Sequence, residues 1–232
     1  MAKQFSGFPK ALFTFLEDLA RNNNREWFQA HKGRYEADVV EPVLRFIEAV
    51  GVEVLPAISR SFVADPRKSG GSMFRIVRDT RFSHDKRPYK ENVACQFRHV
   101  LGRDVHAPGF YVHLEPGRVF IGAGSWQPAR PALEQIRAAI AARPAAWSRA
   151  IGDPALSRYF GGIEGESLKR PPRGVDPDHP HIADLKRKSH YVLKDVAPSR
   201  ALRPAFLDDV EETFTQASPL MRFLAEAVGI PY

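Results

Sequence analysis

The chain has 232 residues and a mass of 26.1 kDa, and its content of 44% hydrophobic and 26% charged residues is typical of a folded globular protein. The single cysteine, Cys95, excludes an intrachain disulfide and a zinc site built from several cysteines. We expect it to be a small buried side chain in a reducing compartment. No apolar run approaches the roughly 20 residues needed to span a bilayer, and the first residues lack the apolar stretch of a signal peptide. We therefore expect a cytoplasmic protein that does not enter a membrane.

Positive charge is concentrated in one segment. The net charge is +7 and the pI is near 9.7, which favours anionic partners. Residues 67–90 contain eight lysines and arginines and two aspartates, so the net charge of this segment is +6. Such a stretch is typical either of an anion site or of a surface that is held by its own ion pairs.

The first quarter of the chain has helical periodicity. Apolar residues at spacings of three and four, with Pro9 at the start, predict a helix over residues 9–21. Asn23 and Glu26 have the spacing of a capping box, which predicts that Asn23 caps a second helix. Pro42 predicts the start of a third, longer helix that continues to Val54.

After the loop at residues 67–71 the period changes to that of strands. Residues 74–77 alternate, and Val93, Cys95 and Phe97 share one side of a second extended run. Residues 110–114 also alternate, and a four-residue loop at 115–118 would place 114 opposite 119, 112 opposite 121 and 110 opposite 123. All apolar side chains of this predicted hairpin then share one face, and a tight two-residue Pro-Gly turn would twist poorly there.

The other face of the hairpin would carry Tyr111, His113, Phe120, Gly122 and Gly124. The two glycines leave room above the sheet for another packed element or for a ligand, and packing is the more common use. Further along, Pro131 predicts a helix through Ile140, and residues 190–196 predict a last strand. Ser199 and Ser218 can each cap a closing helix, the last with Pro219 at its first position and Gly229 as its stop.

These elements predict an α+β fold with an antiparallel (mixed) central sheet and with N-terminal and C-terminal helices packed around it. We expect a single domain over residues 1–232, because no linker divides the chain. Its helical N-terminal part would cover about 9–60, its sheet-rich middle about 73–124 and its mixed helical C-terminal part about 131–229.

Several stretches, in order along nearly the whole chain, resemble a known family. They begin with Asn-Asn-Arg-Glu-Trp-Phe at 23–28 and the run Arg-Asp-Thr-Arg-Phe-Ser-His-Asp-Lys-Arg-Pro-Tyr-Lys at 78–90. They continue with Gly-Phe-Tyr-Val-His-Leu-Glu-Pro-Gly at 109–117, Gly-Ala-Gly-Ser-Trp-Gln-Pro at 122–128 and Lys-Arg-Pro-Pro-Arg-Gly at 169–174. The chain is similar to domain-of-unknown-function family 2461, which is found in bacteria and fungi. The resemblance favours a single domain and implies no activity, cofactor or catalytic residue.

The basic segment supplies the candidate ligand-binding residues. Guanidinium forks and ammonium groups bind phosphate and carboxylate, and the interleaved aspartates can orient them. The candidates are Arg75, Arg78, Asp79, Arg81, Asp85, Lys86, Tyr89 and Lys90. The alternatives are a salt-bridged surface and a sequence-independent nucleic-acid site that uses Phe82 and Tyr89 among the cations.

Tyr111, His113 and Glu115 share a strand face and are candidate catalytic residues, because they could supply a hydroxyl donor, a general base and its orienting carboxylate. An ion pair of Glu115 with Arg118, and a histidine packed on Phe120, would explain the same residues. Asp176, Asp178 and His179, with His181 nearby, have oxygen and imidazole groups that could hold a divalent metal, and with His113 they suggest a metal-assisted hydrolase. The same residues also form ordinary turns.

No P-loop, His-Glu-x-x-His or Gly-x-Ser-x-Gly motif is present, and Gly122-Ala-Gly-Ser lacks the third glycine of a dinucleotide fingerprint. The sequence assigns no cofactor and no oligomeric state. It leads to one preferred hypothesis, an anionic small molecule held between the basic segment and the face that carries Tyr111, His113 and Glu115, in a binding protein or an enzyme of unknown type.

Overall fold

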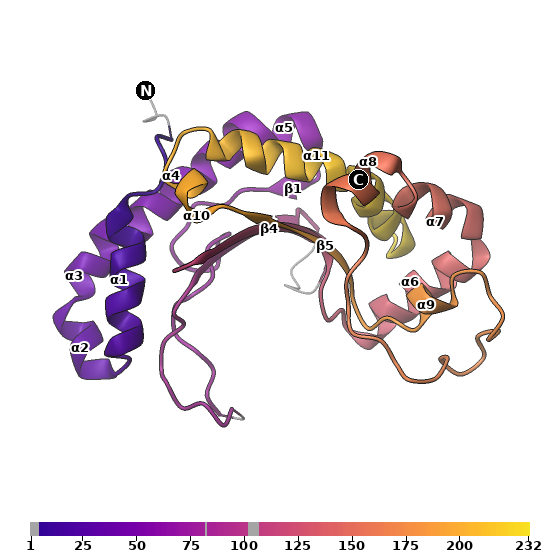
Figure 1. Cartoon of the computed structure of the whole chain (residues 1–232), viewed down its shortest axis with the longest axis horizontal. Helices are drawn as coiled ribbons and strands as arrows, with labels where there is room; N and C mark the ends of the chain where they lie inside the picture. The colour runs from indigo at the N-terminus through magenta and orange to yellow at the C-terminus, as the bar shows by residue number, and fades with distance from the viewer. Residues whose placement is uncertain (1–4, 82, 102–106) are drawn as a thin grey trace.

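A computed structural model describes residues 5–81, 83–101 and 107–232. At its centre is a five-stranded sheet of β1 (Phe62–Val63), β2 (Val93–His99), β3 (Gly109–Glu115), β4 (Arg118–Ser125) and β5 (His190–Val196). The strands lie side by side in chain order and every neighbouring pair is antiparallel. Helices precede β1, lie between β4 and β5, and follow β5, and helices from the first and last of these groups cover one face of the sheet (Figure 1). The predicted α+β class is confirmed, and the sheet is wholly antiparallel.

The β3–β4 hairpin has the predicted register. Leu114 lies opposite Val119, Val112 opposite Ile121, and Phe110 opposite Ala123. The loop, however, is shorter than predicted, since Glu115 and Arg118 also pair and only Pro116 and Gly117 form the turn. Gly117 has φ of 81°, which is the value that a type II turn requires after proline. Pro-Gly therefore makes the tight turn that the sequence reasoning rejected.

The N-terminal helical part begins with α1 (Lys10–Arg21) and α2 (Arg25–Ala30). The cap of α2 is not Asn23 but Asn24, whose side chain accepts a hydrogen bond from Trp27 N at 2.9 Å. The chain then continues through α3 (Lys32–Tyr35), π-helical η1 (Glu36–Val40), α4 (Glu41–Ala49), π-helical η2 (Val50–Val54) and α5 (Leu55–Ile58). The predicted helix start at Pro42 thus lies in the first turn of α4, directly after η1.

Residues 74–77 do not form the predicted strand. Met73, directly before them, forms an isolated bridge with Cys95 of β2, and Val77 forms one with Tyr89, which lies outside the sheet. The short strand β1, which the sequence pattern did not indicate, lies at the edge of the sheet beside β2. Alternation over only four residues is compatible with any extended segment, so it could not distinguish a strand from a loop.

The C-terminal part contains α6 (Arg130–Ala142), α7 (Pro144–Ile151), α8 (Pro154–Phe160), α9 (Ile182–Leu185), α10 (Pro198–Ala201) and α11 (Phe206–Ala227). Neither Ser199 nor Ser218 is an N-cap. Ser199 lies inside α10, and Ser218 lies inside α11, where its hydroxyl donates to Phe214 O at 2.9 Å. Pro219 is accommodated in α11 because buried residues on both sides of it, including Phe214 and Leu224, keep one continuous apolar face. Their burial offsets the cost of a proline in a helix interior, about 3 kcal/mol.

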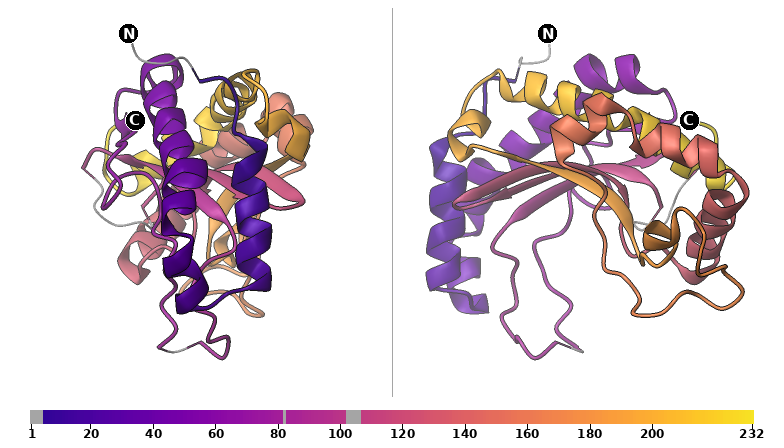
Figure 2. Two further views of the ribbon diagram at one scale, coloured as in Figure 1. Left: turned by 90° about the vertical axis from the view of Figure 1, so that its left-hand side faces the viewer. Right: turned by 45° about the vertical axis from the view of Figure 1, so that its right-hand side comes forward.

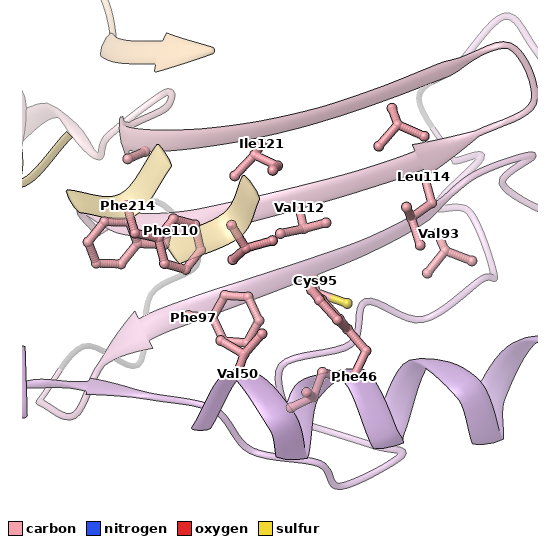
Figure 3. Packing of buried hydrophobic residues seen from close by; sticks show 14 of the residues in the cluster. Phe46, Val50, Val93, Cys95, Phe97, Phe110, Val112, Leu114, Ile121 and Phe214 are labelled. Carbon is pink, nitrogen blue, oxygen red and sulfur yellow. The ribbon is translucent and has the colours of Figure 1, made fainter. Parts of the chain in front are cut away.

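Helices α4 and α11 pack over the sheet from the same side, as two further views show (Figure 2). Phe110, Val112 and Leu114 of β3 are fully buried there. Phe214 of α11 stacks on Phe110 with 4.3 Å between ring centroids. Figure 3 shows this pair and, nearby, Phe46 of α4 pointing toward β2. The buried apolar side chains of the described residues form one continuous cluster.

Cys95 belongs to this core, as the sequence predicted, and burial raises the pKa of its thiol. A thiol in this environment stays protonated and is a poor nucleophile. Among the helices of the described residues, none combines the length and apolar character needed to cross a membrane.

Candidate functional site

The face of the sheet opposite the core borders a cleft of about 820 Å³. Its lining comes from the cleft-facing residues of β2, β3, β4 and β5 and from the segment that precedes β2. In Figure 1 this segment hangs below the sheet, on the side away from α11. Residues on β3 therefore alternate between the core and the cleft, which is the consequence of the two-residue period of a strand.

Three cleft-facing side chains of β3 form a hydrogen-bonded chain. Tyr111 Oη lies 3.1 Å from His113 Nδ1, and His113 Nε2 lies 3.2 Å from Glu115 Oε2. Since the Glu115 carboxylate accepts from Nε2–H, Nδ1 is free to accept from the Tyr111 hydroxyl, and Asn92 Nδ2 approaches the same nitrogen at 3.4 Å. The arrangement assigns a neutral His113 with its proton on Nε2.

Burial supports that assignment. It lowers the pKa of His113 more than the neighbouring Glu115 carboxylate raises it. Burial also raises the pKa of Tyr111, so its hydroxyl keeps its proton at neutral pH. The predicted residues Tyr111, His113 and Glu115 are thus brought together as a polarised chain that runs from the inside of the cleft to the half-exposed Glu115.

Phe120 forms a wall beside this chain. Its ring stacks on His113 at 4.4 Å between centroids. The Arg118 guanidinium lies over the same Phe120 ring, 4.6 Å from its centroid. Arg118 lies 3.4 Å from Asp195 of β5, whereas Glu115 contacts His113. The stacking of His113 on Phe120 is therefore present, while the charge of Arg118 is directed to Asp195 and not to Glu115.

The basic segment has two limbs that are joined by backbone hydrogen bonds. Arg78 N donates to Pro88 O at 2.9 Å, and Lys90 N donates to Ile76 O at 2.8 Å. Beyond this junction most of the cations have partners within the segment: Arg78 with Asp85, Arg81 with Asp79, and Arg87 with Asp85 and Glu91. Lys86 donates to Thr80 O at 3.0 Å.

The ion pairs hold the aspartates in their charged form. Arg87, and then Arg78, keep the pKa of Asp85 far below its usual range, and Arg81 lowers the pKa of Asp79 to about 2. The predicted interleaving of aspartates with arginines therefore produces mutual neutralisation along much of the segment. This agrees with the salt-bridged alternative for Arg81, Asp85 and Arg87.

Lys90 differs from the other cations of the segment. It is partly buried in the cleft lining, and its ammonium lies 5.2 Å from the centroid of the Phe74 ring. Within the part of the chain that the structure describes, this ammonium makes neither a hydrogen bond nor an ion pair. Burial, together with the nearby positive charge of Arg75, lowers the pKa of Lys90.

Asn23 fixes the segment that carries Lys90. Its side chain accepts from Tyr89 N at 3.1 Å and donates to Tyr89 O at 3.0 Å and to Glu91 Oε1 at 2.8 Å. The Tyr89 ring stacks on Phe28 of α2 at 4.1 Å between centroids. Sequence reasoning gave Asn23 a local capping role, and the structure shows that it ties the N-terminal helices to the cleft instead.

Of the eight predicted ligand-binding residues, Arg78, Asp79, Tyr89 and Lys90 line the cleft. Arg75, Arg81, Asp85 and Lys86 are not part of its lining. Phe82, which the nucleic-acid alternative used, lies outside the described residues. Lining residues that were not predicted as site residues include Phe74, Asn92, Trp126 and Tyr191.

The glycines opposite Tyr111 and Gly109 serve both of the uses that the sequence suggested. A Cβ atom on Gly122 would lie 2.6 Å from Leu193 Cδ2, and one on Gly124 would lie 2.4 Å from His190 O. Strand β5 thus packs against both positions. Both glycines also line the cleft, so the sheet backbone is exposed to it there.

The candidate metal ligands have other partners. Asp176 Oδ1 accepts from Asp178 N at 2.9 Å, and His179 Nδ1 accepts from His181 N at 3.0 Å, which are turn interactions. The His181 ring contacts Ser148 Oγ at 2.8 Å. Over residues 5–81, 83–101 and 107–232, no three His, Cys, Asp or Glu side chains gather in a way that could hold a metal ion. These contacts are the turn interactions that the sequence suggested as the alternative for Asp176, Asp178 and His179.

Comparison with known families gives one match. The model of a family described as "Conserved hypothetical protein (DUF2461)" matches residues 11–223, which is most of the chain and includes every residue of the cleft lining. No curated protein matches the chain. The resemblance predicted from the sequence is therefore confirmed, and the family description names no activity.

Proposed function

We propose that this chain, which belongs to the DUF2461 family of conserved hypothetical proteins, binds a phosphate- or carboxylate-bearing small molecule in the cleft beside its sheet. The observation that carries the proposal is the Lys90 ammonium, a partly buried positive charge in the cleft lining without a described anionic partner. Removing a charge from water is costly unless another charge or hydrogen bonds compensate for it. An anionic ligand would supply that compensation.

Arg78 can assist Lys90. It lines the same cleft, and only its Nη1 atom has a described partner, Asp85 at 2.5 Å. The remaining guanidinium N–H groups are suited to phosphate or carboxylate oxygens. Asp85 would then act as the residue that orients Arg78, since it contacts Arg78 and Arg87 at the same time.

The Tyr111–His113–Glu115 chain gives the cleft a second polar element. Neutral His113 adds no charge that would compete with Lys90, and the Tyr111 oxygen can accept a hydrogen bond from a ligand hydroxyl while it donates to His113. This chain would orient a ligand whose anionic group lies at Lys90. A catalytic use of the same three residues would need a proton on the ligand within reach of Tyr111.

The ion pairs count against the nucleic-acid alternative. A site for a nucleic-acid backbone needs several unpaired cations along one surface, whereas Arg81 and Arg87 are bound to Asp79, Asp85 and Glu91. An anion site that depends on Lys90, with Arg78 beside it, agrees better with this distribution of charge.

Calorimetric titration at low salt tests the proposal, with inorganic phosphate, pyrophosphate, ribose 5-phosphate, adenosine monophosphate, citrate and benzoate as probes. We expect at least one probe to bind wild type, and Lys90→Met to weaken that binding about tenfold or more, the effect of losing one charge-assisted contact of about 1.5–3 kcal/mol. Lys86→Met is the matched control, because Lys86 belongs to the same segment but is exposed and bonded to Thr80 O.

Binding that is equal in wild type and Lys90→Met would overturn the role of Lys90. The absence of binding by wild type to all six probes would overturn the anion site itself. A loss of affinity in both lysine variants would show that only the net charge of the segment matters, which also contradicts a specific site.

A further inference from the structure

The cleft is too large for a simple anion. Small-molecule sites have volumes of roughly 300–1,000 Å³, and this cleft, at about 820 Å³, lies in the upper part of that range. A bare phosphate or acetate at Lys90 would leave most of the volume filled with water. A ligand that fills more of this cleft would extend from Lys90 along the sheet.

Trp126 marks a second binding element in the same cleft. Among the described residues, six large hydrophobic side chains are exposed, and Trp126, at 56% exposure, is the only aromatic one. It lines the cleft together with Lys90. The exposed part of the indole offers a wide flat surface of the kind that is enriched in binding sites.

The backbone holds Trp126 in this place at a cost. The next residue, Gln127, has φ of 46° and is the only residue other than glycine with a positive φ in the part of the chain that is described. A left-handed conformation costs a residue with a side chain about 1–2 kcal/mol. Gln127 N donates to Ser189 Oγ at 2.8 Å, which fixes the turn against the start of β5. Strain that is maintained beside an exposed aromatic ring is typical of a binding site.

Two glycines of the sheet lie in the cleft lining together with Trp126. Gly109 and Gly124 are cross-strand partners, and both line the cleft. Neither glycine carries a side chain, and the neighbouring side chains border the two positions: a Cβ atom on Gly109 would lie 3.4 Å from Gln96 Nε2, and one on Gly124 would lie 2.7 Å from Tyr191 Cβ. A flat floor beside an exposed indole suits a flat group, whereas a bulky aliphatic group would leave gaps against both surfaces.

We infer that the ligand of this cleft joins a planar aromatic ring, stacked on Trp126 over the floor formed by Gly109 and Gly124, to an anionic group held at Lys90. The inference rests on the proposed anion site and adds the chemical class of the ligand. A nucleotide and an aromatic carboxylic acid share this chemistry, and they differ in the anionic group and in length.

The experiment measures dissociation constants for probes that differ only in one part. Adenosine monophosphate is compared with ribose 5-phosphate, which lacks the ring, and with adenosine, which lacks the anion. Benzoate is compared with cyclohexanecarboxylate, which has no aromatic face. We expect the ring to improve affinity about tenfold in at least one of these pairs, the size of one base–aromatic stacking contact. The pair that shows the gain identifies the nucleotide or the carboxylic acid.

Trp126→Leu should remove this tenfold gain and leave the affinity for the probe without an aromatic ring unchanged, while Trp126→Phe should restore most of it. A cooperative thermal unfolding transition in both variants verifies that they are folded. Ring binding should also quench the fluorescence of wild type, and Trp126→Leu should abolish the quenching, since Trp147 is fully buried in the core and Trp27, which stacks on His31, is not part of the cleft lining.

The failure of this inference can be distinguished from the failure of the anion site. If the probes with and without an aromatic ring bind equally and Lys90→Met weakens both, the anion site stands and the planar-ring ligand is excluded. If Trp126→Leu lowers the affinity for both kinds of probe equally, Trp126 only shapes the cleft, and the stacking role is wrong. If adenosine binds as well as its monophosphate and Lys90→Met has no effect, both the anion site and the joined ligand are overturned.

Discussion

The two faces of β3 are built by the same seven residues and have opposite properties. Toward the helices, Phe110, Val112 and Leu114 are completely buried, whereas the side chains that alternate with them on the other face border the cleft. The face toward the helices is out of contact with water, because α11 and the N-terminal helices cover it. The second face keeps polar groups in hydrogen bonds to one another and leaves space beside them.

This difference shows how stability and binding can be separated within one strand. Substitutions toward the helices should act mainly on the free energy of unfolding, since they open cavities in a packed interior. Substitutions toward the cleft should act mainly on ligand affinity and on proton positions, because the groups there are already partly hydrated. Each of the following four experiments compares the two faces or the contacts that hold them.

The largest effect should come from the covered face. Phe214→Ala removes the ring that stacks on Phe110 and leaves a cavity between α11 and the sheet. We expect the free energy of unfolding to fall by about 3–5 kcal/mol. Urea denaturation at neutral pH measures it. A loss below about 1 kcal/mol would mean that the helix and the sheet are not packed as described.

Acidification should act next, through a histidine of the covered face. The His190 side chain is fully buried, and its Nε2 donates a hydrogen bond to Asp184 O at 2.9 Å. Burial lowers its pKa from 6.5 to about 4. The unfolded chain therefore takes up a proton before the folded chain does. The contribution of the neutral, buried His190 to the free energy of unfolding is complete above pH 6.5. It should be lost at about 1.4 kcal/mol per pH unit as the pH falls toward 4.

Urea denaturation at several pH values checks this slope. His190→Gln should flatten it, because glutamine can keep the donor to Asp184 O but does not titrate. His84→Gln is the control, since His84 is exposed. If His190→Gln and wild type lose stability with the same slope, His190 is not the group that makes the fold sensitive to acid.

An intermediate effect should come from the contact that joins the N-terminal helices to the cleft. Asn23→Ala removes three hydrogen bonds to Tyr89 and Glu91 and should lower the free energy of unfolding by about 1–3 kcal/mol. It should also weaken anion binding, because Lys90 follows Tyr89 directly. Asn22→Ala provides the comparison: its side chain bonds only to the exposed end of α1, at Asp18 O, and we expect a change within about 0.5 kcal/mol.

The smallest effect on stability should come from the cleft face itself. Tyr111→Phe keeps the ring but removes the hydroxyl that donates to His113 Nδ1, which should cost about 1 kcal/mol. That hydrogen bond favours the neutral imidazole, so its loss should move the pKa of His113 upward. An NMR titration of the histidine rings detects the shift. An unchanged pKa would mean that Asn92 Nδ2, at 3.4 Å, already satisfies this nitrogen.

The parts of the fold that depend on local periodicity could be predicted from the sequence. The β3–β4 register followed from requiring every apolar side chain of the hairpin to share one face, and the structure has that register. Pro219 and Asn23 show the limit. A proline normally begins a helix, but the apolar face of α11 continues through it, and an asparagine before a helix normally caps it, but Asn23 bonds to a segment far along the chain.

The candidate site was predictable only in part, for a similar reason. The sequence located Lys90 and the Tyr111–His113–Glu115 face, because a cluster of charge and strand alternation are local patterns. It could not show which cations would be neutralised, since the pairs Arg78–Asp85 and Arg87–Glu91 depend on how the two limbs fold back. Trp126 belongs to a stretch that resembles the family, but nothing in the sequence indicated that it is a site residue, because an exposed indole and a buried one look alike before the chain is folded.

Strand order has a consequence for how the molecule assembles. Four strands follow one another along the sheet, so β3 and β4 can meet as soon as their two-residue turn forms, and β1 and β2 can add from nearby. The last strand must wait until the whole stretch between Ser125 and His190 has closed into a long loop. Closing a long loop costs conformational entropy before the contacts of the strand can stabilise it. We therefore expect β5 to pair with β4 late in folding. The edge of β4, and with it the glycine floor, would then be the last part of the cleft to acquire its final form.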